Sequence, residues 1–224
     1  MSNALSQNYH TIINELKAVN VNLVAVSKMQ SVEVIKKLYQ LGQRDFGENY
    51  VQELIEKQRS LPADIRWHFI GHLQTNKVKF IASFIYLIQG VDSFKLLKEI
   101  NKEAKKNDRT INVLLQVHIA KEESKFGLDA NELNDLLVNQ IPGGPLQHVN
   151  IMGLMGMASF TNHLEKVREE FKYLKTLYNK YSQLSTDNCQ LQTLSMGMSG
   201  DYKIAIEEGS NMVRIGSLIF GPRH

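Results

Sequence analysis

The chain has 224 residues, of which 43% are hydrophobic and 22% are charged, and its formal net charge at pH 7 is +3. These values are typical of a soluble globular protein with one large core. The Lys and Arg residues are spread among Asp and Glu instead of forming a run, so we expect neither nucleic acid nor an anionic membrane as a partner.

The cysteine content and the apolar segments narrow the class further. Cys189 is the only cysteine, which excludes an intrachain disulfide and a cysteine-based metal cluster. The N-terminus lacks the basic stretch and apolar run of a signal peptide. The apolar segment 80–88 is much shorter than the roughly 20 residues that span a bilayer. The sequence therefore predicts a cytoplasmic protein.

Apolar runs typical of strands alternate with amphipathic segments along nearly the whole chain. A leading helix comes first, and the strand-like runs then cover 23–28, 44–48, 66–71, 84–91, 111–120, 149–158, 191–199 and 211–220. The segments between them that read as helices cover 31–41, 49–60, 73–83, 93–107, 129–140, 163–184 and 201–209. About eight strand-then-helix units in a chain of this length predict a parallel (β/α)8 barrel with an extra N-terminal helix.

An open doubly wound sheet is the competing architecture. Polar and glycine-containing features follow most of the runs, as in "SK" 27–28, "GEN" 47–49, "SMGMS" 195–199 and "RIGS" 214–217. In a barrel, all carboxyl ends of the strands surround one mouth, whereas an open sheet binds its ligand at one switch point. The barrel is favoured because a single ligand can then contact all these features.

Residues 1–224 are predicted to form a single domain. No linker rich in Pro, Gly or Ser interrupts the alternation of strands and helices. The segment "IPGGPLQH" at 141–148 must break regular structure, and the pattern resumes directly after it, so it reads as a surface turn.

Lys28 stands at the end of the first strand-like run. A lysine delivered into an enclosed site loses hydration, which favours the neutral, nucleophilic amine. Such an amine can form a Schiff base with an aldehyde or ketone. A lone lysine after a strand is also compatible with an ordinary surface residue, so the other end of the chain decides between the two interpretations.

Two loops near the C-terminus resemble a phosphate site. The segment "SMGMS" at 195–199 offers two hydroxyls and a glycine just before a predicted helix, whose first backbone N–H groups lack internal partners. The segment "RIGS" repeats this chemistry after the last strand, and many barrels bind phosphate after strands seven and eight. An aldehyde at Lys28 and a phosphate at these loops together describe pyridoxal 5'-phosphate (PLP).

Several motifs resemble those of the pyridoxal phosphate homeostasis proteins, whose fold is similar to the N-terminal barrel of alanine racemase. In order, they are "AVSK", "FGENYVQE", "WHFIGHLQTNK", "KEESKFGL", "GLMGMA" and "LSMGMSGDYKIAIEEGSNMVRIGSLIFG". The match runs from about residue 23 to 222. Three departures are Ser217 and Asn211, where threonine is common, and His118, where asparagine is common; Ser217 keeps the hydroxyl.

The resemblance implies roles for particular residues. Lys28 would form the Schiff base and Asn49 would lie beside the cofactor ring. Arg214 would face the pyridine nitrogen. The phosphate would be held by Ser195, Met196, Gly197, Ser199, Gly216 and Ser217.

An arginine at the ring nitrogen has a mechanistic consequence. Arginine donates hydrogen bonds and accepts none, so it favours an unprotonated ring and a weaker electron sink. Racemisation also needs a second acid/base group, which a separate domain and the dimer partner supply in alanine racemase. Here the barrel candidates are Tyr50, Tyr202, His68 and His72.

The sequence therefore predicts a PLP-binding protein of vitamin B6 homeostasis that holds PLP on Lys28 without catalytic turnover. It would pass PLP to apo forms of PLP-dependent enzymes and would be a monomer, with no metal site. A PLP-dependent amino-acid racemase is the alternative, and a class I aldolase without cofactor is a third possibility. The charged segment "KEESK" at 121–125 is expected to cover part of the cofactor.

Overall fold

The computed structural model describes residues 2–120, 126–141, 146–183, 185–186 and 189–221. The first half contains α1 (Ser2–Ala18), β1 (Asn22–Val26), α2 (Val32–Gln40), β2 (Asp45–Glu48), α3 (Val51–Ser60), β3 (Arg66–Phe69), η1 (Thr75–Phe80), β4 (Leu87–Val91) and α4 (Phe94–Lys106). The second half contains β5 (Ile111–Val117), α5 (Ala130–Asp135), η2 (Leu136–Gln140), β6 (Val149–Gly156), α6 (Leu164–Tyr181), β7 (Ser185–Thr186), β8 (Cys189–Ser195), α7 (Tyr202–Glu207), β9 (Met212–Ile215) and α8 (Ser217–Phe220).

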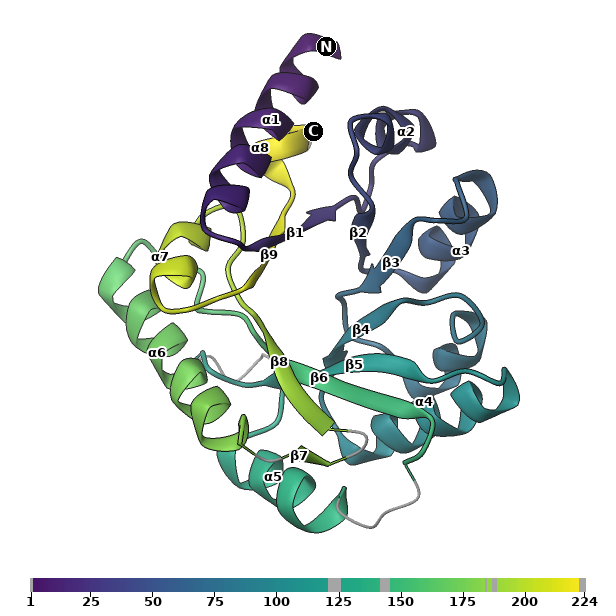
Figure 1. Ribbon diagram of the computed structural model, residues 1–224, viewed down its shortest axis with the longest axis vertical. Helices are drawn as coiled ribbons and strands as arrows, with labels where there is room; N and C mark the ends of the chain where they lie inside the picture. Colours follow the sequence, from purple (N-terminus) through teal and green to yellow (C-terminus); the bar gives the residue numbers. More distant parts are fainter. Residues whose placement is uncertain (1, 121–125, 142–145, 184, 187–188, 222–224) are drawn as a thin grey trace.

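The described residues form a closed barrel of eight parallel strands with the helices outside it (Figure 1). The strands follow the order β6-β5-β4-β3-β2-β1-β9-β8, and pairing of β6 with β8 closes the ring. The prediction of a (β/α)8 barrel preceded by a helix is confirmed, and the open doubly wound sheet is excluded.

Three segments differ in detail from the sequence-based prediction. The segment 73–83 contains only the short 3-10 helix η1 where a longer helix was expected. The last strand ends at Ile215, because the N–H of Gly216 donates to the side chain of Ser199 and residues 217–220 turn into α8. The additional strand β7 pairs antiparallel with β8. The predicted loop at 121–125 and residues 142–145 of the turn at 141–148 lie outside the described residues.

Side chains of each strand alternate between the barrel interior and the helical layer. The interior contains a small apolar cluster of Val24, Leu87, Leu114, Met155 and Met212. Most of the residues directly before or after these five in sequence belong to the much larger core between barrel and helices. Any residue two positions from a member of the inner cluster on the same strand therefore also faces the interior.

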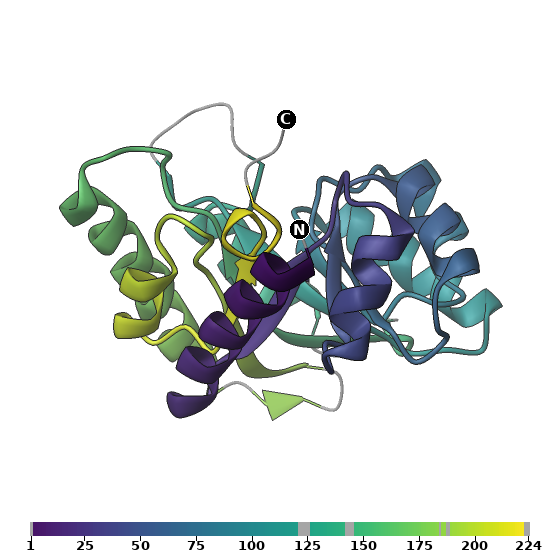
Figure 2. The same cartoon turned by 90° about the horizontal axis from the view of Figure 1, so that it is seen from above.

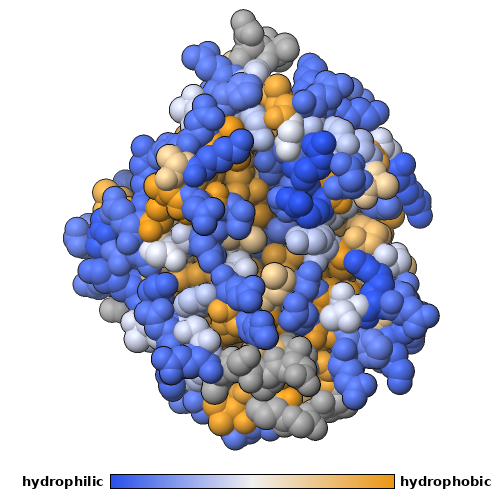
Figure 3. Space-filling view, viewed as in Figure 1, coloured by the Kyte–Doolittle hydropathy of each residue, from blue (hydrophilic) through white to orange (hydrophobic). Residues whose placement is uncertain are grey.

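Helix α1 packs beside α8, as both views show (Figures 1 and 2), and the Asn8 amide donates to the carbonyl oxygen of Ile219 at 3.4 Å. On the face shown in Figure 3, hydrophilic residues line the outer helices and hydrophobic ones fill the spaces between them. Within the described ranges, no helix has both the length and the apolar character needed to cross a membrane.

Candidate functional site

The strand order brings the predicted site residues together at one mouth. Strands β2, β1, β9 and β8 are consecutive neighbours in the barrel. Asn49 follows β2, Lys28 follows β1, Gly216 follows β9, and the segment 196–199 follows β8. Because all four strands are parallel, their carboxyl ends lie on the same side. Segments nearly 190 residues apart in sequence thus form one site.

Lys28 lies in a turn directly after β1 and is half-buried. The preceding residue, Ser27, is fully buried; its N–H donates to the carbonyl oxygen of Gly47 at 3.0 Å, and its hydroxyl donates to Glu48 at 2.6 Å. The following residue, Met29, has a φ of 63°, which is unfavourable for a side chain of its type. The Met29 N–H donates to a carboxylate oxygen of Glu53 at 2.5 Å, which holds this turn in place.

A buried lysine organises the base of this turn. The Lys57 ammonium donates to Glu48 at 2.8 Å, to Glu53 at 2.6 Å and to the carbonyl oxygen of Ser27 at 2.7 Å. Burial raises the pKa of Glu48, and the Lys57 charge and hydrogen bond oppose that rise. The ammonium of Lys57 satisfies three acceptors at once, so it joins α3 to the ends of β1 and β2.

Asn49 supplies an unsatisfied polar atom at the mouth. Among the described residues, its side-chain oxygen Oδ1 is buried and has no hydrogen-bond partner. Gly71 packs against the Asn49 backbone so closely that a Cβ at position 71 would lie 2.5 Å from its carbonyl oxygen. A buried polar atom without a partner is costly, so this oxygen is suited to a ligand or an ordered water.

The loops that follow β8 and β9 are joined to each other. The Gly216 N–H donates to the Ser199 hydroxyl at 3.2 Å, and the Arg214 N–H donates to the Gly197 carbonyl oxygen at 3.0 Å. Gly197 has a φ of 95°, and a Cβ there would lie 2.6 Å from that of Ala205. Ser217 is exposed at the start of α8, whereas Met196 is fully buried. The hydrogen bond between Gly216 and Ser199 brings two hydroxyl-bearing loops together, and hydroxyl groups can donate to an anion.

Arg214 lies inside the barrel and not on its outer face. It is two residues from Met212 of the inner cluster, and it is 3% exposed. Its guanidinium donates to the Ser195 hydroxyl at 2.6 Å and to the Gly156 carbonyl oxygen at 3.0 Å. Burial lowers the pKa of Arg214 to about 10, while the Asp201 charge opposes the change. The guanidinium therefore remains charged at neutral pH.

Ser195 is placed differently from the other predicted phosphate residues. It is the last residue of β8 and is fully buried. Its hydroxyl donates to the side-chain oxygen of Gln89 at 2.7 Å and accepts from Arg214. Since its single hydroxyl proton is already directed to Gln89, Ser195 has no proton left for an anion.

The four acid/base candidates occupy different places. The Tyr202 hydroxyl donates to Glu15 of α1 at 3.0 Å, and burial together with this carboxylate raises the pKa of Tyr202 to about 12. His68 lies in the barrel interior and contacts Asp45 and Gln89. Tyr50 and His72 are at the mouth, where Tyr50 is exposed. Only these last two are therefore placed where a ligand at the mouth could reach them.

His72 at this mouth has two further contacts. Its Nδ1 lies 2.9 Å from a carboxylate oxygen of Asp92. Its ring stacks on Phe126 at a centroid distance of 4.0 Å. The aspartate and the aromatic ring fix the orientation of the imidazole.

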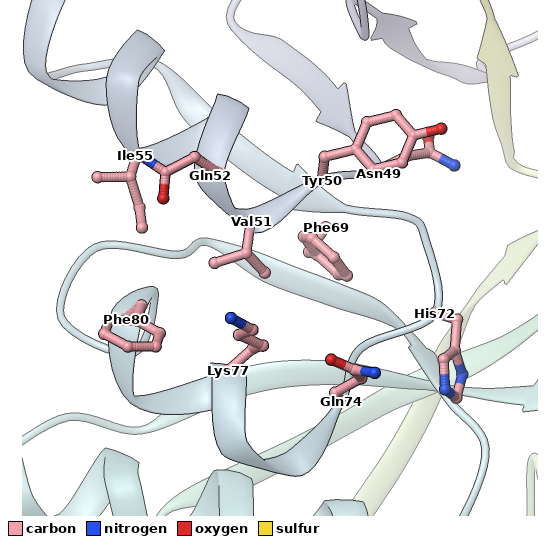
Figure 4. Close-up of a pocket in the computed structure, with 10 residues that line it drawn as sticks. All are labelled: Asn49, Tyr50, Val51, Gln52, Ile55, Phe69, His72, Gln74, Lys77 and Phe80. Carbon is pink, nitrogen blue, oxygen red and sulfur yellow. The ribbon is translucent and has the colours of Figure 1, made fainter.

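A cavity of about 400 Å³ opens beside the mouth, between the start of α3 and η1 (Figure 4). Both elements contribute apolar and polar side chains to it, with His72 at one end. The lining residues are Asn49, Tyr50, Val51, Gln52, Ile55, Phe69, His72, Gln74, Lys77 and Phe80. Asn49 belongs to both the cavity wall and the site.

Sequence reasoning missed two residues of the site. Gln89 lies in the apolar run 84–91, and its position two residues after Leu87 is the signal that directs it into the barrel. Lys57 has no comparable signal, since it reads as one of several basic residues on α3. Within the described ranges, no group of three or more His, Cys, Asp or Glu side chains is arranged to hold a metal ion.

This protein is a β/α barrel with a lysine after its first strand and with hydroxyl-bearing loops after its last two barrel strands, and these features define a class of barrel proteins. Residues 2–224 match the family model described as "Alanine racemase, N-terminal domain". The chain belongs to this family and, within it, to the pyridoxal phosphate homeostasis proteins. It is 42% identical to the pyridoxal phosphate homeostasis protein of Pasteurella multocida, over 91% of this chain and 87% of that protein.

Other relatives agree. The human pyridoxal phosphate homeostasis protein is 36% identical over 93% of this chain and 79% of its own length. PipY of Synechococcus elongatus, in a structure with PLP bound, is 33% identical with a TM-score of 0.86, covering 97% of this chain and 100% of that chain. Alanine racemase from Bartonella henselae is 20% identical with a TM-score of 0.74, covering 99% of this chain and 59% of its own, and it shares the fold.

Proposed function

We propose that this protein binds pyridoxal 5'-phosphate reversibly through Lys28 and serves to hold and supply it. The observation that carries the proposal is the neighbourhood of Lys28 and Arg214. They belong to adjacent strands, in which Val24 pairs with Arg214, so a reactive amine and a buried permanent donor share one mouth. The printed names of the relatives and the PLP-bound PipY structure support the same ligand.

The residues present fit the chemistry of this cofactor. The buried Oδ1 of Asn49, which has no hydrogen-bond partner among the described residues, marks a place for a ligand, and the loops at 197–199 and 216–217 bring the hydroxyls of Ser199 and Ser217 together for a phosphate dianion. We assign the aldehyde to Lys28, the ring surface to Asn49 and the ring nitrogen to Arg214. The phosphate is assigned to Gly197, Ser199, Gly216 and Ser217, with the backbone of Met196 and the buried Ser195 behind them.

The proposal includes the absence of catalytic turnover. Bound PLP supplies an electron sink that is strongest when its ring nitrogen is protonated. Arg214 remains a charged donor at neutral pH and has no acceptor to hold a proton on that nitrogen. The Tyr202 hydroxyl donates to Glu15, and His68 lies in the barrel interior beside Asp45. Two of the four acid/base candidates are therefore not at the mouth.

The experiment that tests the site is borohydride reduction of the PLP-loaded protein followed by peptide mass mapping. We expect the reduced adduct on the peptide that contains Lys28, and no adduct in Lys28→Ala. Lys77→Ala is the matched control, because Lys77 lines the neighbouring cavity. An adduct on another lysine, or an unchanged adduct in Lys28→Ala, would disprove the assignment. Stoichiometric yellow protein as isolated would dismiss a cofactor-free aldolase.

Turnover and partners are tested separately. We expect no interconversion of alanine enantiomers and no activity with a broad amino-acid panel; sustained turnover would establish the racemase alternative.

Transfer of PLP is tested by mixing the loaded protein with the apo form of a PLP-dependent enzyme and measuring the recovered activity of that enzyme. We further propose a cytoplasmic monomer with residues 1–224 as a single domain, which sedimentation and cell fractionation would test.

A further inference from the structure

A continuous chain of hydrogen-bonded side chains crosses the barrel interior below the proposed site. It runs from Arg214 through Ser195, Gln89 and His68 to Asp45, on five different strands. The four successive distances are 2.6, 2.7, 3.0 and 3.0 Å. Four of the five residues are buried, and Asp45 at the opposite end of the barrel is half-buried.

The direction of every hydrogen bond follows from the arginine. A guanidinium can only donate, so Ser195 accepts from Arg214 and directs its own proton to Gln89. The atom of Gln89 that receives it is the side-chain oxygen, so the amide nitrogen faces Nδ1 of His68 and donates to it. Nδ1 must then be unprotonated, and the ring proton sits on Nε2 and is donated to Asp45.

The far end of the chain is fixed by charge. Arg66 donates to both carboxylate oxygens of Asp45, from Nε at 2.7 Å and from a terminal nitrogen. The second amide proton of Gln89 is directed to the sulfur of Met212 at 3.4 Å. A doubly protonated His68 would place an N–H against the amide N–H of Gln89, so the arrangement selects one neutral tautomer.

We propose that Gln89 and His68 are positioning residues for Arg214, which hold its guanidinium through Ser195 and so set its orientation toward the ring nitrogen of the cofactor. This inference rests on the proposed function in one respect, namely that Arg214 faces the ring nitrogen of PLP. It gives Ser195 the task of linking Gln89 to Arg214. The row of hydrogen bonds from Arg214 to Asp45 is present in the protein without ligand.

The first test is nitrogen-15 NMR of the protein without cofactor. We expect the His68 signals of a neutral ring protonated at Nε2, with Nδ1 at the shift of a hydrogen-bond acceptor. We also expect guanidinium protons of Arg214 that exchange slowly with solvent. A ring protonated at Nδ1, alone or together with Nε2, would overturn the proposal.

The second test uses Gln89→Leu, with Gln116→Leu as its matched control. Gln116 is a buried glutamine on the neighbouring strand β5 and also faces the interior. It donates to the carbonyl oxygen of Phe126, which is not part of the row of hydrogen bonds from Arg214 to Asp45. We expect only Gln89→Leu to accelerate exchange of the Arg214 protons and to weaken PLP binding about tenfold, as the loss of one or two hydrogen bonds would. Equal effects of both variants, or none, would refute the positioning role.

Gln89→Glu keeps the shape of the side chain and covers the case in which Gln89→Leu does not fold. A carboxylate cannot donate to His68, so we expect Nδ1 to become protonated and the histidine signals to change. An unchanged Nδ1 signal would disprove the hydrogen bond from Gln89 to His68. If Lys28 does not bind PLP while these signals behave as expected, the proposed function is wrong and the row of hydrogen bonds from Arg214 to Asp45 is still supported.

Discussion

The ammonium of Lys57 donates to the carbonyl oxygen of Ser27 at 2.7 Å, so a buried lysine on α3 holds the residue that precedes Lys28. The same ammonium forms ion pairs with Glu48 and Glu53, and Glu53 in turn accepts a hydrogen bond from the N–H of Met29. Both neighbours of Lys28 in sequence are thereby fixed to α3. The position of the proposed reactive amine depends on an ion cluster beneath it.

Replacing Lys57 by methionine should strongly destabilise the protein. The substitution leaves the buried carboxylate of Glu48 without its charged partner, and breaking a buried pair in this way costs about 3–5 kcal/mol. Urea unfolding monitored by circular dichroism measures the loss. Lys102→Met, which removes an exposed lysine paired with Glu99, should leave the unfolding midpoint unchanged. Similar losses in both variants would show that the cluster has no special role.

Asp45 should make stability depend on pH in the acid range. Burial alone would raise the pKa of this carboxyl, but hydrogen bonds from Arg66 and His68 outweigh it and lower the pKa to about 2, from 3.8. A lowered folded pKa stabilises the protein above pH 3.8, and this contribution is lost as the pH falls toward 2. It amounts to roughly 2 kcal/mol. Urea midpoints measured between pH 5 and 2 should show the decrease, and Asp45→Asn should flatten that part of the profile.

Gly197→Ala should damage the loop after β8. The residue has a φ of 95°, and the new Cβ would lie 2.6 Å from that of Ala205, so strain of about 1–3 kcal/mol is expected. Gly200→Ala in the same loop is the control, because a Cβ there meets nothing within 4 Å. Thermal unfolding and PLP titration of both variants decide the matter. Equal behaviour of the two would mean that Gly197 is not needed for its conformation.

Tyr202→Phe should leave the cofactor site intact. The Tyr202 hydroxyl donates to Glu15 on α1, so its removal should cost about 0.5–1.5 kcal/mol of stability through that one hydrogen bond. PLP absorbance and affinity should match the unmodified protein. A large loss of PLP affinity would place the hydroxyl in the site after all and would revive Tyr202 as an acid/base candidate.

The sequence by itself determined the barrel and the identity of most residues at its mouth. Strand-like runs alternating with amphipathic segments are local signals, and the rule that carboxyl ends of barrel strands share one face then groups Lys28, Asn49 and the 195–199 and 214–217 segments. The end of the last strand was misjudged, because Gly216 leaves the ladder through a hydrogen bond to Ser199 that no local pattern reveals.

Only the tertiary structure decided what lies behind the mouth. Gln89 joins the site through Ser195, 106 residues away in sequence, and Lys57 joins it through Ser27 after β1 and Glu48 on β2. Their sequence neighbourhoods look like ordinary apolar strand and charged helix. Composition and periodicity report which face a residue occupies, whereas the atom it bonds to depends on which strands closure of the barrel places opposite one another.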